Sequence, residues 1–108
     1  MTLERLFITL NAIDGMSGKT VYRAWPEGAA PALPFICYRE IGDDNFAADN
    51  HVYAPFTRIA VELYTEFKDS ASEAKVEAAI ENCGTAWTKE EYYLDDERCY
   101  EIVYEFEI

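Results

Sequence analysis

Residues 99–108 read Cys99-Tyr100-Glu101-Ile102-Val103-Tyr104-Glu105-Phe106-Glu107-Ile108 and decide the fold. The even positions are all apolar or aromatic, and the odd positions after Cys99 are glutamates, with Val103 the exception. Successive side chains of a β-strand point to opposite faces, so this segment has one apolar face and one acidic face. The pattern predicts a strand that packs on a core.

A second segment, residues 56–67, predicts the central strand of the same sheet. Its apolar side chains fall on one face and its charged side chains on the other: Ile59, Val61, Leu63 and Phe67 against Arg58, Glu62 and Glu66. Shorter strands are expected at residues 20–24, 35–40 and 85–94. Prolines and Gly28 mark a loop over residues 26–34, and residues 42–55 are expected to form a polar loop that closes on Pro55.

Two helices complete the pattern. Apolar residues recur at helical spacing over residues 2–13, where Thr2 can cap the first free amides. Ser70 and Glu73 match a capping box, which predicts that the second helix begins there. A helical stripe runs from Val76 to Cys83, and Gly84 is a natural stop.

The chain of 108 residues is therefore expected to be a single α+β domain spanning residues 1–108. The element order is α-β-β-β-α-β-β. Strands that are close in sequence favour antiparallel pairing, which predicts one mostly antiparallel sheet of about five strands with both helices on one face.

Composition limits the classes of function. The net charge is −12, and residues 69–108 hold twelve acids and three bases, whereas residues 1–68 hold nine acids and six bases. This charge argues against tight direct binding of nucleic acid, because binding requires cations to replace the counterions on phosphate. The apolar runs are too short to cross a membrane, and the first residues do not resemble a secretory leader. Three cysteines without a CxxC pair indicate free thiols in a reducing cytoplasm.

No catalytic, cofactor-binding or metal-binding residue is predicted. Gly18-Lys19-Thr20 resembles the end of a P-loop but lacks its first glycine, and it follows a helix where a strand is required. His51 is the only histidine, and the cysteines that could pair with it fall on buried positions. Neither a zinc site nor a calcium loop is complete, and adjacent acids such as Glu90-Glu91 point to opposite faces if extended.

The segment 45–53 is the best candidate for an interaction surface. It places two aromatic residues in an otherwise polar connection, and long loops with aromatic residues often make contacts. The candidate subunit or partner interface consists of Asn45, Phe46, Asp49, Asn50 and Tyr53. The alternative is that Phe46 and Tyr53 fold back onto the core.

Four stretches together carry a resemblance: residues 34–38 (PFICY), 45–50 (NFAADN), 60–69 (AVELYTEFKD) and 100–108 (YEIVYEFEI). In their order, and in the length of the chain, they resemble the small tail completion, tail terminator or head–tail joining proteins of long-tailed bacteriophages and prophages. The resemblance covers nearly the whole chain, but its motifs are packing motifs. The three cysteines and the acidic second half depart from the family pattern.

The resemblance implies a structural protein with no active site, present in the host bacterial cytoplasm during assembly and then in the virion. It implies a homo-oligomeric ring, often a hexamer, at the junction of tail and capsid, with other tail or neck proteins as partners. An acidic lumen in such a ring would let DNA slide without sticking.

Two other classes of function stay open. The charge of −12 also suits an acidic inhibitor or DNA mimic that binds a basic nucleic-acid enzyme. An enzyme of unfamiliar type would need a pocket that holds titratable groups with perturbed pKa values.

Overall fold

The computed structural model describes the backbone of residues 1–43, 46–48, 51–54 and 56–108, and the side chains of residues 1–42 and 56–108. Its elements, in chain order, are α1 (Leu3–Asn11), β1 (Thr20–Tyr22), β2 (Phe35–Asp43), β3 (Phe46–Ala48), β4 (His51–Ala54), β5 (Thr57–Thr65), α2 (Ser70–Glu81), β6 (Trp87–Leu94) and β7 (Cys99–Glu107).

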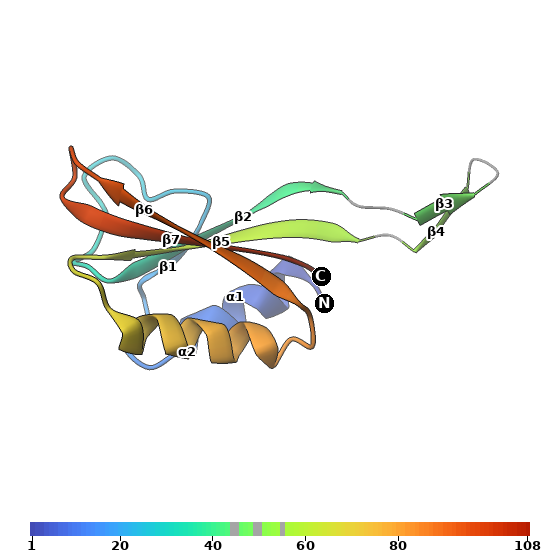
Figure 1. Ribbon diagram of the computed structural model, residues 1–108, viewed down its shortest axis with the longest axis horizontal. Coiled ribbons are helices and arrows are strands. Elements are labelled where there is room, and N and C mark those ends of the chain that lie inside the picture. Colours follow the sequence, from blue (N-terminus) through green and yellow to red (C-terminus); the bar gives the residue numbers. More distant parts are fainter. Residues whose placement is uncertain (44–45, 49–50, 55) are drawn as a thin grey trace.

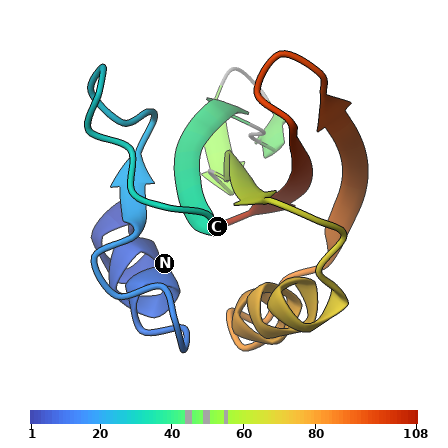
Figure 2. The same ribbon diagram turned by 90° about the vertical axis from the view of Figure 1, so that its left-hand side faces the viewer.

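The main sheet has five strands in the order β1-β2-β5-β7-β6, and both helices cover one of its faces (Figure 1). This confirms the predicted α+β class and the element order of the main body. Viewed along the strands, the sheet curves over the two helices (Figure 2). We call the face that lies away from α1 and α2 the outer face.

One strand pair differs from the prediction. β1 and β2 are parallel, whereas every other neighbouring pair of the main sheet is antiparallel. Parallel neighbours need a long connection that returns the chain to the same end of the sheet, and residues 23–34 supply it. The expectation of antiparallel pairing fails here because this connection is far longer than a hairpin turn.

The core lies between the sheet and the helices. Ile59, Val61 and Leu63 of β5 are fully buried, as their alternation predicts. On β7, Ile102 and Tyr104 are also fully buried and Phe106 nearly so. Phe67 was expected on the same apolar face, but β5 ends at Thr65, so the alternation stops and Phe67 is exposed.

Each helix begins at a side-chain cap. Thr2 Oγ1 accepts a hydrogen bond from the Arg5 amide at 3.1 Å, as predicted. The cap of α2 is Asp69, whose carboxylate accepts from the amide and the hydroxyl of Ser72. The predicted cap, Ser70, is the first helical residue instead, because a carboxylate one position earlier satisfies the free amides. Gly84, just after α2, has a positive φ of 75°, which favours glycine.

The predicted polar loop over residues 42–55 is wrong. β2 continues to Asp43, and β3 and β4 form a separate antiparallel pair beyond the end of the main sheet (Figure 1). We call β3 and β4 the distal hairpin. It gives the molecule its long axis, with principal extents of 49 × 26 × 23 Å.

Candidate subunit interface

The outer face of the sheet carries a row of residues in register across its strands. Val21, Cys37, Glu62, Val103 and Glu90 lie opposite one another on β1, β2, β5, β7 and β6. No helix covers this face (Figure 2). The row runs from an apolar residue at the β1 edge to an acidic residue at the β6 edge.

At the middle of this row two carboxyl groups meet. Glu62 and Glu101 share a hydrogen bond, and Tyr64 Oη donates to Glu101 Oε2 at 2.7 Å. Burial raises the pKa of Glu62 to about 7, with the hydrogen bond and charge of Glu101 adding to the shift. The positive charge of Arg39, whose Nε lies 3.9 Å from Glu62, acts in the other direction and lowers this pKa. Glu62 therefore binds a proton near neutral pH, and the acidic face carries less charge than the sequence suggests.

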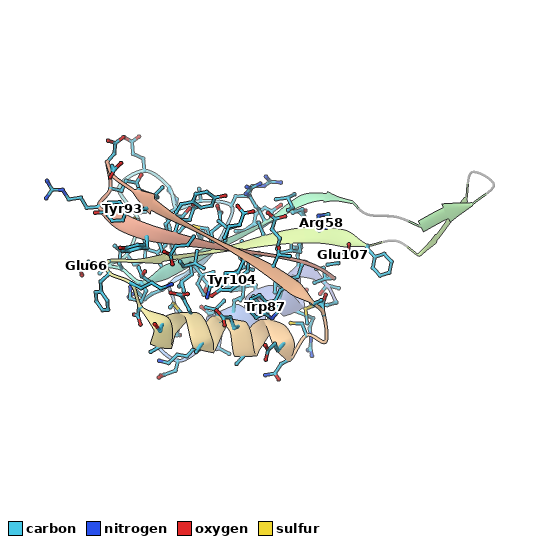
Figure 3. The ribbon with its side chains drawn as sticks, in the orientation of Figure 1. Arg58, Glu66, Trp87, Tyr93, Tyr104 and Glu107 are labelled. Atoms are coloured by element: carbon cyan, nitrogen blue, oxygen red, sulfur yellow. The ribbon has the colours of Figure 1, made fainter. Side chains whose placement is uncertain are left out.

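Arg58 reduces the acidity of the outer face at the end from which the distal hairpin extends. Its guanidinium lies 3.0 Å from Glu105 and 3.7 Å from Glu107, on the neighbouring strand β7 (Figure 3). A hollow of about 310 Å³ beside this group is also lined by Trp87 and Phe106.

An ionic cluster around the buried Glu73 joins α2 to the sheet on the opposite face. Glu73, whose side chain is only 4% exposed, lies 2.8 Å from Lys68 Nζ and 2.7 Å from Lys89 Nζ. Glu77 accepts from Lys89 and from the hydroxyl of Tyr104, both at 2.8 Å. Figure 3 shows Tyr104 and Trp87 between β6, β7 and α2.

Sequence reasoning assigned Glu73 to the helix cap and missed this cluster. The spacing along the helix could have indicated that Glu73 is buried. Glu73 lies three residues before Val76 and seven before Ile80, so it shares their face of α2, and both are buried. Burial alone would raise the pKa of Glu73, but hydrogen bonds from Lys68 and Lys89 outweigh it, and the pKa lies below its ordinary value. The cluster therefore holds a charged carboxylate inside the fold.

The described residues contain no group of three or more potential metal ligands. Burial raises the pKa of all three thiols, that of Cys37 to about 11, which disfavours the reactive thiolate. The cysteines lie on β2, after α2 and on β7, and His51 lies on β4.

Neither helix in the described part of the chain could span a membrane.

The predicted interface residues fall on or beside the distal hairpin. Phe46 is the first residue of β3, and Tyr53 lies on β4. Asn45, Asp49 and Asn50 lie outside the described residues. Whether Phe46 and Tyr53 fold back onto the core stays a prediction, since only the backbone is described there.

Models of known protein families and curated proteins yield no match to this chain. The geometry of the surfaces therefore has to carry the functional argument.

Proposed function

We propose that this protein is a structural subunit of a ring at the junction of tail and capsid in a long-tailed bacteriophage or prophage. It acts through shape and self-association. The observation that carries the proposal is the distal hairpin, which lies beyond the sheet and the helices that cover it (Figure 1).

A two-stranded hairpin by itself is marginally stable in water, and additional strands or a packed surface stabilise it. β3 and β4 pair only with each other in the described structure, in strands of three and four residues. A neighbouring subunit would supply the missing surface. Phe46 and Tyr53 are the residues whose side chains would then be buried between subunits.

The charge distribution fits a ring through which DNA passes. Residues 57–108, which build β5, β6 and β7 of the main sheet, contain fourteen acids and five bases. A lumen lined by such strands repels phosphate, so DNA would move through it without adhering. In this proposal the acidic surface guides DNA, and no residue reacts with it.

Self-association is the direct test. Sedimentation velocity over a wide range of protein concentration, combined with negative-stain microscopy, is expected to reveal closed rings. Mixing the protein with tail tubes is expected to cap their ends. A chain that stays monomeric at the highest concentration and leaves tail ends bare would contradict the proposal.

The net charge of −12 favours a second candidate, an acidic inhibitor that occupies the nucleic-acid site of a basic enzyme. Immobilised protein would then retain a basic nucleic-acid enzyme from host extract and release it as salt is raised, because screening weakens charge attraction. Retention of such an enzyme by a monomer, in stoichiometric amounts and with loss of its activity, would favour this candidate over the ring.

A further inference from the structure

The main sheet ends at two strands, β1 and β6, each of which pairs with one neighbour only in the described structure. β6 is eight residues long, and its residues from Thr88 to Tyr93 are all exposed. An open strand edge offers unpaired amides and carbonyls to another strand, so proteins cover such edges or use them for association.

The two edges differ in charge on the outer face. Lys19 comes just before β1 and shares the parity of Val21, which the register places on the outer face. Lys19 forms no ion pair with another described residue, whereas Arg23, just after β1, contacts Glu40 and the ring of Tyr22 on the helix-covered face. At the other edge, Glu90 lies on the outer face of β6 and, among the described residues, accepts a hydrogen bond only from the neutral hydroxyl of Tyr92. On the outer face, one edge therefore carries a lysine and the other a glutamate, neither in an ion pair with another described residue.

The edges match on the helix-covered face as well. Tyr22 of β1 is 40% exposed there and packs edge-on against Tyr38. Tyr93 of β6 is 51% exposed and packs edge-on against Tyr100 (Figure 3). Each edge therefore offers an exposed aromatic ring to a partner strand, and aromatic residues stabilise contacts between strands.

We propose that the β6 edge of one copy pairs with the β1 edge of the next, so that the sheet continues from subunit to subunit. This deepens the proposed ring and rests on it. The occupant of each edge is a second copy of this chain, bound head to tail, with Glu90 facing Lys19 of its neighbour. A two-fold contact between two β6 edges would instead bring two copies of Glu90 together, which is unfavourable.

A head-to-tail contact uses two different surfaces, so an open assembly of any length still offers one free edge of each kind, at its two ends. Repetition gives a closed ring when the rotation between subunits closes, and a filament when it does not. β1 has three residues, which limits the shared ladder to a short segment. Side-chain complementarity therefore has to contribute much of the specificity, and this makes the contact sensitive to charge reversal.

The test reverses the charge of each edge separately and then of both together. Glu90→Lys and Lys19→Glu are each expected to weaken self-association about tenfold, because an attractive pair becomes a repulsive one. The double variant, Glu90→Lys with Lys19→Glu, swaps the charges of the two edges and is expected to restore assembly. Glu66→Lys makes the same change of charge beyond the end of β5, away from both edges, and is expected to assemble normally.

Far-ultraviolet circular dichroism would establish that each variant is folded, and Glu90→Gln offers a milder replacement, expected to weaken assembly less, if Glu90→Lys does not fold. Rings that form equally well from both single variants would overturn the edge pairing and leave the ring itself standing. Weakening by both single variants without rescue in the double variant would also overturn it. A wild-type chain that never associates would overturn both the pairing and the proposed ring.

Discussion

Glu73 is a carboxylate in a helical position that would ordinarily face the core with an apolar side chain. Its two lysine partners lie on different segments: Lys68 precedes α2, and Lys89 lies on β6. The pairing therefore ties the helix to the edge strand. A buried ion pair need not stabilise more than an apolar contact would, but removing one partner leaves the others uncompensated.

Replacing Glu73 with glutamine tests this tie. Glu73→Gln is expected to lower the free energy of unfolding by about 2 kcal/mol, the scale of hydrogen bonds to a charged group. Urea denaturation would measure it. Glu66→Gln, at an exposed position, serves as the control and should change stability by less than about 0.5 kcal/mol. Equal effects from the two variants would show that the cluster contributes nothing.

Protonation adds a second readout at Glu73. Because the folded-state pKa lies below the ordinary value, the ion pairs stabilise the fold above that ordinary value and are lost as the pH falls. The difference in stability between the wild type and Glu73→Gln should therefore shrink in acid. A difference that grows as the pH falls would contradict the assignment.

Glu62 should show the opposite dependence on pH. Its pKa of about 7 in the folded chain lies above the value of about 4.3 for an unfolded chain. The folded state therefore holds an extra proton between these values, and the stabilising effect of that proton is lost as the pH rises through 7. Glu62→Gln, neutral throughout, is expected to melt at a higher temperature than the wild type at pH 8 and close to it at pH 5.

Thermal melts of both chains across this range would measure the effect. Glu66→Gln again provides a control, since its melting curve should follow the wild type at every pH. Parallel curves for Glu62→Gln and the wild type would rule out the raised pKa of Glu62.

At the scale of the element, the distal hairpin can be separated from the rest of the fold. Asp43 of β2 pairs with Thr57 of β5, so a two-residue Asn-Gly turn can replace residues 44–56. All core residues among the described side chains lie outside this segment, so the free energy of unfolding should change by no more than about 1 kcal/mol. Self-association is expected to disappear.

Urea denaturation and sedimentation equilibrium on the shortened chain would measure the two effects separately. Rings formed normally by the shortened chain would remove the hairpin from the interface. Collapse of the fold would show instead that the hairpin supports the main sheet.

The elements that could be predicted from sequence are those with long regular patterns. β5 and β7 alternate over nine residues each, and their buried faces follow that alternation. The distal hairpin was missed because its strands are short, although Asp49-Asn50 between Phe46 and Val52 is a turn signal. The ion partners of Glu73 and the proton on Glu62 depend on contacts between segments far apart in the chain, which no local pattern records.

At the scale of the whole molecule, charge is distributed unequally. Residues 1–42 contain four bases and four acids, whereas residues 57–108 contain fourteen acids and five bases. The first group builds α1, β1 and β2, and the second builds the rest of the main body. The molecule is thus nearly neutral at one edge and strongly acidic at the other, which favours head-to-tail over two-fold association.

The same excess of acid should oppose folding at low ionic strength. Raising sodium chloride from about 20 mM to about 300 mM is expected to raise the melting temperature, because the screening length falls well below the size of the molecule. Calorimetry in buffers of fixed pH would measure the shift, and Glu97→Lys, which removes part of the excess in the β6–β7 turn, should reduce it. A melting temperature that falls with salt would show that the ion pairs outweigh the repulsion.

The route by which β2 and β5 lead out to the distal hairpin has a mechanical consequence. A pull on a docked hairpin acts along both strands, and the β5–β7 ladder resists it with hydrogen bonds that lie across the direction of pull. The eight residue pairs from Arg58 to Thr65 would share that load in shear, at the centre of the sheet. Tension between neighbouring subunits would thus reach the most deeply buried strands directly, without bending a loop on the way.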